Sequence, residues 1–341
     1  MRDSFGWAGL GWFFLLLASN ATAWNAAGHR LSASLAWNEM SAETQRQVTA
    51  LLQQHPALPL WEQQIRRGKA AVEVTPLALF AEASTWPDEL RRQAAAVKDS
   101  DKQGAAVNRD WHYVNWPVGR GAAHSRGGRL DQAIEAQAAR LADRWLPAGD
   151  RAVALAWLVH LVADAHQPLH VATWPLPDGS FDDGGLGFPV RDDQRRRFAD
   201  TSLHSWWDEL PGPPWLRGER LASRSELLRE AYPAAAIAQR ESGDWIAESF
   251  ELAGQDLRPS VAADQLPWPI SEAYRARAKK ISERRLAESG VRLGRLLDAI
   301  LSAERAIRRA RDAGNAGRGA TANRPETRAP AGACCPASAV R

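Results

Sequence analysis

Residues 151–166, with the sequence RAVALAWLVHLVADAH, constrain the fold of this chain more than any other stretch. Apolar side chains lie on nearly every side of a helix drawn through them, and Pro168 ends that helix. A helix that is apolar all round has to be buried, so other elements must cover it. The sequence therefore predicts a central buried helix surrounded by further structure.

Helical patterns recur along the rest of the chain. Residues 43–54 and 129–146 are expected to be helices, and Leu286, Leu293, Leu297 and Ile300 form one apolar stripe at helical spacing. Residues 174–200 are rich in Pro and Gly, which predicts a loop with one short hairpin. We therefore expect an all-α fold, mostly helical, with a short hairpin or loop insertion.

The two ends of the chain differ from the body. An apolar run at residues 10–18 precedes the A-x-A pattern Ala21-Thr22-Ala23, which is typical of a cleaved signal peptide. That run is shorter than the roughly 20 apolar residues of a membrane-spanning helix. We expect a signal peptide at 1–23, a catalytic domain at 24–304 and a disordered tail at 305–341. The mature protein would then start at Trp24 and be secreted or periplasmic, without stable membrane association.

Charge and cysteine content limit the function classes. The net charge is +3, but residues 305–341 carry eight Arg against Asp312 and Glu326, so the body is acidic. The basic balance is therefore poor evidence for a nucleic-acid-binding face on the body. Cys334 and Cys335 are adjacent in the tail and cannot cross-link the body, so bound metal is a candidate for bracing the fold.

Two His–Asp pairs have a spacing that places both side chains on one helix face. His160 and Asp164 lie in the buried helix, and His204 and Asp208 lie in LHSWWDEL. Either pair alone is more often a structural hydrogen-bonded pair than a metal site. A buried carboxylate and imidazole need partners, however, and a cation serves both. The candidate ligands along the chain are His29, Asp88, His112, His160, Asp164, His170, His204 and Asp208.

Zinc fits this ligand set best, because imidazole and carboxylate occur without thiolate; manganese, iron and nickel accept similar ligands. A catalytic zinc takes about three protein ligands plus water, so eight side chains predict two or three ions close together. Sites with two metals stabilise both the attacking and the leaving oxygen of a phosphoryl displacement.

Five short motifs, in this order, resemble those of the zinc-dependent single-strand-specific nucleases, the S1/P1 nuclease family. They are WNAAGH, WPDELR, WHYVN, LVHLVADAHQPLH and LHSWWD, and the resemblance covers residues 24 to about 301. It implies the phospholipase C/nuclease P1 type of fold, with three zinc ions at the base of a cleft.

The resemblance also implies a role for each matching residue. Asp88, His112, His160 and Asp164 would hold one zinc, and Trp24 (through its amino nitrogen and carbonyl oxygen), His29 and Asp164 a close neighbour. His170, His204 and Asp208 would hold a third zinc. Arg91, Asn115 and Asp164 are the expected catalytic residues: Arg91 neutralises the phosphate, Asp164 bridges two ions and Asn115 contacts substrate.

The implied activity is hydrolysis of phosphodiester bonds in single-stranded DNA and RNA by a zinc-activated hydroxide, leaving 5′-phosphates, with 3′-nucleotidase activity. Nucleic acids and nucleotides would be the substrates, and no protein partner is expected. Two alternatives stay open: a zinc phospholipase C of the same fold, and a zinc-binding protein without catalysis.

Two positions depart from the family pattern. Leu186 stands where members usually have Asn after Gly-Gly, and Asn115 stands where many fungal members have Asp. Both changes concern substrate preference and rate rather than metal binding. Of the remaining histidines, we expect His55 and His124 to be solvated, and His166 to form hydrogen bonds at a helix end or behind a metal ligand.

Overall fold

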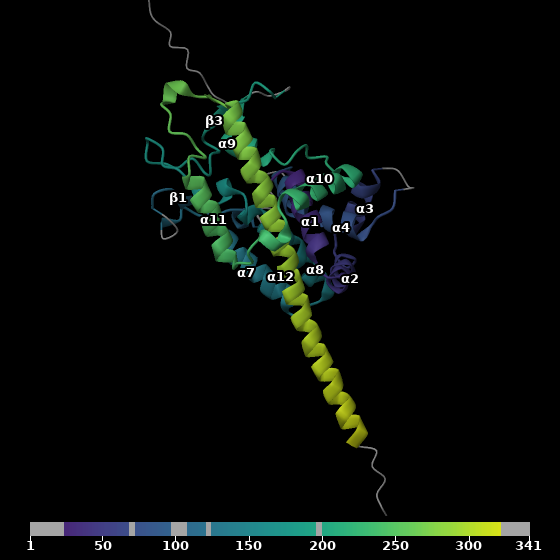
Figure 1. Cartoon of the computed structure of the whole chain (residues 1–341). Coiled ribbons are helices and arrows are strands. Elements are labelled where there is room, and N and C mark those ends of the chain that lie inside the picture. The colour runs from purple at the N-terminus through teal and green to yellow at the C-terminus, as the bar shows by residue number, and fades with distance from the viewer. Residues whose placement is uncertain (1–23, 68–71, 97–107, 121–123, 196–199, 322–341) are drawn as a thin grey trace, which may run out of the picture.

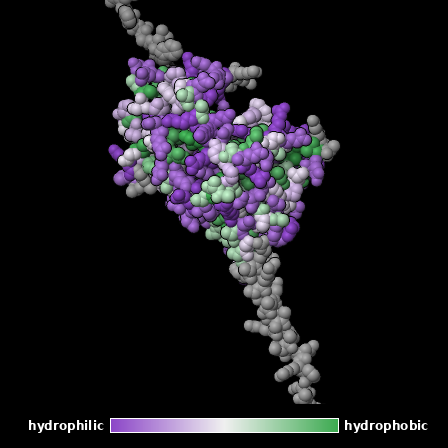
Figure 2. Space-filling model, viewed as in Figure 1, coloured by the Kyte–Doolittle hydropathy of each residue, from purple (hydrophilic) through white to green (hydrophobic). Residues whose placement is uncertain are grey.

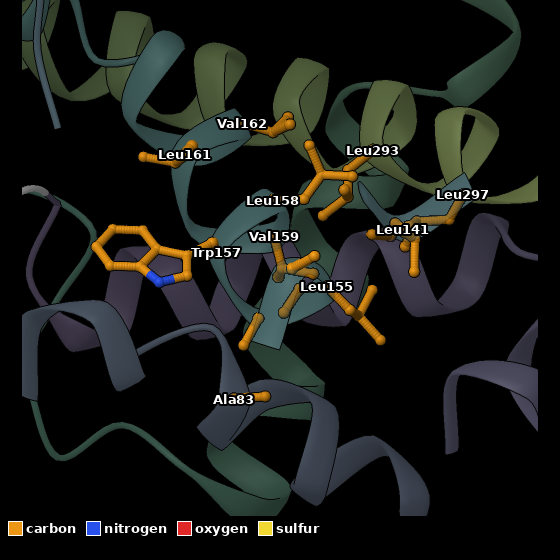
Figure 3. Packing of buried hydrophobic residues seen from close by; sticks show 14 of the residues in the cluster. Ala83, Leu141, Leu155, Trp157, Leu158, Val159, Leu161, Val162, Leu293 and Leu297 are labelled. Carbon is orange, nitrogen blue, oxygen red and sulfur yellow. The ribbon is translucent and has the colours of Figure 1, made fainter. Parts of the chain in front are cut away.

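Helix α8 (Ala148–Ala165) lies at the centre of the computed structural model, which describes residues 24–67, 72–96, 108–120, 124–195 and 200–321 (Figure 1). From Arg151 to the end of the helix, every residue except Val153 is buried. Side chains of neighbouring helices, among them Leu141, Leu293 and Leu297, pack against its apolar residues (Figure 3). The predicted central helix is thus confirmed.

The other helices pack around α8 and around each other, and the expected all-α fold class is confirmed. The longer ones are α1 (Ala26–Glu39), α2 (Ala42–Leu52), α3 (Leu58–Arg66), α4 (Pro76–Ala83), α5 (Trp86–Ala96), α7 (Leu130–Ala142), α10 (Gly218–Ala231), α11 (Ser242–Gly254) and α12 (Glu272–Thr321). The short ones are η2 (Arg109–Trp111), η4 (Pro168–His170), α9 (Leu203–Asp208), η5 (Ala234–Ala236) and η6 (Ala263–Gln265).

Helix α1 lies directly against α12, and two glycines allow the close approach. A Cβ atom on Gly290 would lie 2.3 Å from the Cβ of Leu35, and one on Gly294 would lie 2.7 Å from the Cβ of Glu39. Asn25 caps α1, because its side-chain oxygen accepts hydrogen bonds from the backbone nitrogens of Ala27 and Gly28. The Asn25 cap and the close contact between α1 and α12 together determine the position of the first described residues.

Short strands close the loops between the helices. β1 (Trp116–Pro117) pairs in parallel with β2 (Ala172–Thr173), which joins the segment after His112 to the segment after α8. β3 (Pro189–Arg191) and β4 (Asp200–Ser202) pair antiparallel as the predicted hairpin, and β4 extends beyond the expected segment 174–200. β5 (Trp268–Pro269) adds to β3 in parallel, which the sequence did not indicate.

Two expectations about local structure are wrong. Helix α12 continues to Thr321, so residues 305–321 of the expected disordered tail are helical; Ala and Arg, which dominate there, are strong helix formers. The remaining tail residues, with Cys334 and Cys335, lie outside the described residues, as does the expected signal peptide. His55 is 3% exposed rather than solvated, because its ring packs against Trp61 and Trp86.

The surface is mostly polar on the face shown in Figure 2, where apolar residues are scattered among charged ones. Within the described ranges, no helix has both the length and the apolarity that crossing a membrane requires. In the interior, buried hydrophobic residues form two clusters, which position the groups described next.

Candidate metal centre

His160 and Asp164 project from the same face of α8, one helical turn apart, and both are fully buried. The Nε2 atom of His160 lies 3.2 Å from Oδ2 of Asp164. The His112 side chain, on the segment after η2, reaches the same oxygen, with its Nδ1 atom also 3.2 Å away. The two imidazoles thus converge on one carboxylate oxygen from two different elements.

The second oxygen of the Asp164 carboxylate faces α1. His29 Nε2 lies 3.6 Å from Asp164 Oδ1, and the His29 ring stacks on the His160 ring at 3.8 Å. The two oxygens of this buried carboxylate therefore face different histidines: Oδ1 faces His29, and Oδ2 faces His112 and His160. This arrangement is what a carboxylate bridging two cations requires.

The start of the described chain is held between α8 and α9, two helices that carry candidate ligands. The Trp24 indole nitrogen donates a hydrogen bond to the carbonyl oxygen of Ala163, next to Asp164. The backbone nitrogen of Asn25 donates to the carbonyl oxygen of Asp208. Gly28 is required nearby, because a Cβ atom there would lie 2.6 Å from the Cβ of Trp24.

Helix α5 contributes Asp88 and Arg91. Both side chains are largely buried, and the Arg91 NH2 atom lies 3.1 Å from Asp88 Oδ1. Neither of these two atoms has an aligned hydrogen-bond partner. The guanidinium group is thus close to the candidate ligands and keeps donors for a further acceptor.

His170, His204 and Asp208 form a further group. Asp208 lies 3.8 Å from His170 and 3.5 Å from His204, measured between the nearest carboxylate oxygen and Nε2. Ser202 caps α9 by accepting from the backbone nitrogen of Ser205, which places His204 and Asp208 on the inward face. Gln167 donates a hydrogen bond of 2.9 Å to Asp208 Oδ1 and orients that carboxylate.

Backbone carbonyl groups orient three of the imidazole rings. The Nδ1 atoms of His160, His170 and His204 lie 2.6–2.9 Å from the carbonyl oxygens of Ser84, His112 and Gly184 respectively. A carbonyl oxygen only accepts, so each Nδ1 carries a proton, and Nε2 is the ring nitrogen left to face a metal. Gly184 must be glycine, since a Cβ atom there would lie 2.2 Å from the carbonyl oxygen of Leu169.

The donor atoms fall into three groups that fit metal ions. Within each group the ligand atoms lie within 4.8 Å of one another: His29, His160 and Asp164; Asp88, His112 and His160; His170, His204 and Asp208. Several of these buried donor atoms have no hydrogen-bond partner, including both ring nitrogens of His29, Asp164 Oδ1, His170 Nε2, His204 Nε2 and Asp208 Oδ2. Unsatisfied buried polar atoms are costly, and bound cations would satisfy them.

The electrostatics of the cluster favour bound cations. Burial lowers the pKa of His29 to about 3, which keeps this ring neutral and able to bind metal. Burial raises the pKa of Asp208 to about 8, and the opposing effects of His204 and of the hydrogen bond from Gln167 do not offset it. Burial acts against the charged form of Asp164, but His160 and the hydrogen bonds from His112 and His160 outweigh it and hold the pKa well below its usual range.

A cavity of about 350 Å³ opens beside the cluster. Its wall includes His112, His170, His204 and Arg91, together with Arg109, Tyr113, Asn115, Arg126, Asp183 and Leu186. The two departures from the family pattern, Asn115 and Leu186, thus lie in one cavity. The Asn115 amide nitrogen lies 3.5 Å from Asp183 Oδ1, so this amide faces a carboxylate.

The structure brings together the eight side chains that the sequence singled out as candidate ligands. Sequence reasoning missed Gln167, the three orienting carbonyl groups, and the cavity residues Tyr113 and Asp183. Tyr113 directly follows a candidate ligand, and Asp183 precedes the Gly-Gly pair, so adjacency to a motif was the available signal. No sequence pattern indicates which carbonyl oxygen meets a given ring.

His166, at the end of α8, forms the hydrogen bonds expected of a helix-end residue. Its Nδ1 atom lies 2.7 Å from the Val162 carbonyl oxygen, and its Nε2 atom lies 3.0 Å from Arg292 NH1. Its own carbonyl oxygen accepts from Arg285, which is 2% exposed. This buried network joins α12 to the segment that carries Asp164 and His170. His124 is exposed, as expected.

Comparison with known proteins identifies the family of the chain that carries this site. No curated protein matches the chain. The S1/P1 Nuclease family matches residues 24–302, a range that contains every candidate ligand from Trp24 to Asp208. Membership of a nuclease family supports the conclusion that this chain is a hydrolase that acts on phosphodiester bonds of nucleic acids. With most of its length matched and its His and Asp groups in place, the chain belongs to the S1/P1 nuclease family.

Proposed function

We propose that this protein is a secreted or periplasmic zinc-dependent endonuclease. It hydrolyses phosphodiester bonds of single-stranded DNA and RNA to 5′-phosphate products and also has 3′-nucleotidase activity. The observation that carries the proposal is the convergence of three buried His and Asp groups beside a cavity lined with arginine. The family match supports the nuclease part of the proposal.

Each metal group would hold one zinc ion. Asp88, His112, His160 and Asp164 would hold the first, and Trp24, His29 and Asp164 the second, with Asp164 shared. His170, His204 and Asp208 would hold the third. Zinc bound there would supply Lewis acidity and a nucleophile generated from water near neutral pH.

The protein's own side chains then bind and orient the substrate. Arg91 is close enough to Asp88 to approach a phosphate bound at the cluster, and its charge would offset that of the phosphoryl oxygens. Tyr113 offers an aromatic face in the cavity on which one base of a splayed strand would stack. Asn115 and Asp183 present an amide and a carboxylate to the polar edge of that base.

The deciding experiment uses the mature chain, starting at Trp24. Zinc is counted by mass spectrometry, and single-stranded and duplex DNA and RNA, a 3′-nucleotide and lecithin are assayed in parallel. We expect three zinc ions per chain, preferential cutting of single strands and 5′-phosphate ends. Fewer than two tightly bound zinc ions would contradict the metal assignment. Phosphocholine release without nucleic-acid cleavage would favour a phospholipase C, and full zinc occupancy without any hydrolysis would favour a non-catalytic zinc protein.

The free amino terminus of Trp24 is a specific part of this proposal. An amine with a pKa of about 8 can deprotonate and bind zinc, whereas an amide nitrogen is a poor ligand. We predict that a variant with one extra residue before Trp24 loses one zinc ion and most of its activity. Full activity with three zinc ions in that variant would show that the amino terminus is not a ligand.

A further inference from the structure

Helix α8 ends between ligands of two different candidate metal groups. Asp164 lies in the last turn of the helix and His170 follows in η4, so one short segment carries ligands of both groups. Gln167, between them, donates its side-chain amide to Asp208 and donates its backbone nitrogen to the Asp164 carbonyl oxygen. The path of this segment therefore sets how far apart the two groups lie.

The last carbonyl groups of a helix have no partner within that helix, so other groups must bind them. At the end of α8, the carbonyl oxygen of Ala165 accepts a hydrogen bond of 2.6 Å from the Ser249 hydroxyl of α11. The carbonyl oxygen of His166 accepts from Nε of Arg285, on α12, at 3.3 Å. Side chains of two other helices thus hold the backbone directly after Asp164.

Arg285 is fixed by hydrogen bonds on every side of its guanidinium group. It is 2% exposed, and a guanidinium has five N–H donors in a rigid plane. Five acceptors surround it, namely the carbonyl oxygens of His166 and Trp245, the Ser249 hydroxyl, and the carboxylates of Glu248 and Glu288. The two carboxylates offset the cost of burying its charge. The guanidinium cannot shift without breaking several of these bonds.

A second arginine supports the same segment from about two turns further along α12. The NH1 atom of Arg292 lies 3.0 Å from Nε2 of His166, and its NH2 atom donates to Glu248 Oε1 at 2.9 Å. Glu248 also accepts from Arg285, so one carboxylate holds both arginines. The end of α8 is therefore bound by a connected buried network rather than by one contact.

We propose that Arg285 is a positioning residue for the metal centre. Together with Ser249 it fixes the backbone between Asp164 and His170, and thereby the spacing between the metal groups to which these two ligands belong. Arg285 is not among the residues that line the cavity beside the cluster, so it acts through the backbone and not on substrate. The proposal rests on the proposed function, because it requires that these groups bind metal ions.

A role in stability alone predicts a different result. If the network only stabilised the fold, weakening it would lower the free energy of unfolding and leave the metal site of the folded protein unchanged. A positioning role predicts that the folded protein itself holds its metal differently. Cobalt binds the same kinds of ligand as zinc, and its visible absorption responds to ligand geometry. The cobalt-loaded protein therefore reports on position separately from stability.

The first test compares Ser249→Ala with Ser225→Ala. Both serines are buried, but the Ser225 hydroxyl, on α10, has no hydrogen-bond partner among the described residues. We expect Ser249→Ala to change the cobalt spectrum and to speed up cobalt release to a chelator about tenfold, the lower end of what partners behind a ligand contribute. Ser225→Ala should match the unsubstituted protein in both. A folded Ser249→Ala protein with an unchanged spectrum and release rate would overturn the proposal.

The second test uses Arg285→Lys, which keeps the charge but has three N–H donors in place of five. Arg295→Lys is the control, since Arg295 also lies on α12 and donates to two carbonyl oxygens and a glutamate, those of Ala234, Ile237 and Glu39. We expect Arg285→Lys to lower kcat on an oligonucleotide about tenfold with little change in KM, because the cavity is untouched. Equal kcat values for the two variants would contradict the proposal. If Arg285→Lys does not fold, Ser249→Ala decides.

The metal measurements separate failure of the positioning role from failure of the proposed function. If the unsubstituted protein binds cobalt but cuts no nucleic acid, the proposed nuclease activity fails, and the spectrum of Ser249→Ala still decides the positioning role. If the unsubstituted protein binds metal and cuts nucleic acid while both test variants behave like their controls, only the positioning role is wrong. An unsubstituted protein that binds no metal would contradict both.

Discussion

Asp164 has the most demanding position of any residue in the site. One of its oxygens faces His29, and the other faces His112 and His160. It is fully buried, and its carboxylate stays ionised because neighbouring imidazoles outweigh the cost of burial. A neutral side chain of similar shape would therefore change the charge of the cluster while leaving its packing intact.

We predict that Asp164→Asn lowers zinc content by at least one ion per chain. Activity should fall by roughly 100-fold or more, since even partners behind a ligand cost 10–100-fold. Zinc is measured by mass spectrometry and activity on single-stranded DNA. Asp200→Asn, at an exposed aspartate paired with Arg191, is the control and should match the unsubstituted protein. Unchanged zinc content in Asp164→Asn would contradict the bridging role.

His55 illustrates a different kind of buried histidine, one that packs between aromatic rings and belongs to none of the candidate metal groups. Its Nδ1 atom accepts a hydrogen bond of 3.0 Å from the backbone nitrogen of Ala57, so the ring is neutral. Its ring stacks on Trp61, with the centroids 4.3 Å apart. Burial lowers the pKa of His55 from 6.5 to about 4.

This lowered pKa makes folding stability sensitive to acid. Between pH 6.5 and about 4 the unfolded chain binds a proton at His55 that the folded chain does not, so the free energy of unfolding falls as pH falls through this window. We predict that His55→Phe loses less of its free energy of unfolding across the window than the unsubstituted protein. Urea unfolding of both proteins above and inside the window measures the difference, and equal losses would show that His55 titrates normally.

At the scale of elements, the contact between α1 and α12 determines where two ligand-bearing segments lie. Helix α1 carries His29, and its N-terminus holds Asn25 against Asp208. The contact is close only because Gly290 and Gly294 have no side chain where α1 crosses. A methyl group at either position would collide with backbone or Cβ atoms. Rotating a side chain cannot relieve such a collision, so one of the helices has to move.

We predict that Gly290→Ala destabilises the protein by about 1–3 kcal/mol, the usual cost of overpacking a core. The methyl group would lie 2.3 Å from the Cβ of Leu35, so α1 must move. Gly243→Ala in α11 is the matched control, because nothing lies within 4 Å of its added Cβ and alanine favours the helix. Urea denaturation measures both, and a neutral Gly290→Ala would show that α1 can shift at little cost.

At the scale of the whole molecule, the candidate metal groups lie where several helices and loops meet. Asp88, Asp164 and Asp208 come from α5, α8 and α9, and the histidines come from these and other segments. The two cysteines of the chain are adjacent in the tail, outside the described residues, so no pair of cysteines links these segments. Bound cations would therefore do what disulfides do in many exported proteins.

We predict that removing zinc with a chelator lowers the Tm by at least about 5 °C, because ions that bind only the folded state stabilise it. Differential scanning calorimetry before chelation, after chelation and after zinc is restored measures the effect and its reversibility. A Tm that does not respond to chelation would mean that metal does not brace the fold.

Much of the fold and of the candidate site could be predicted from the sequence. The all-round apolarity of residues 151–166 predicted a buried central helix, and the spacing of His160 and Asp164 placed both side chains on one face. The resemblance to the family implied which histidines and aspartates share an ion, and that assignment stays a prediction. The burial of His55 and the strand β5 could not be predicted, since each depends on contacts with segments far away in the chain.

What the sequence by itself determined is geometry within an element. A helix has a fixed period, so residues four apart share a face wherever that helix lies. Only the tertiary structure decided that the two oxygens of Asp164 face different histidine groups, that carbonyl oxygens of Ser84, His112 and Gly184 orient three rings, and that Asn115 and Leu186 share one cavity. Distances between elements depend on how the entire core packs, and no local spacing in the sequence contains that information.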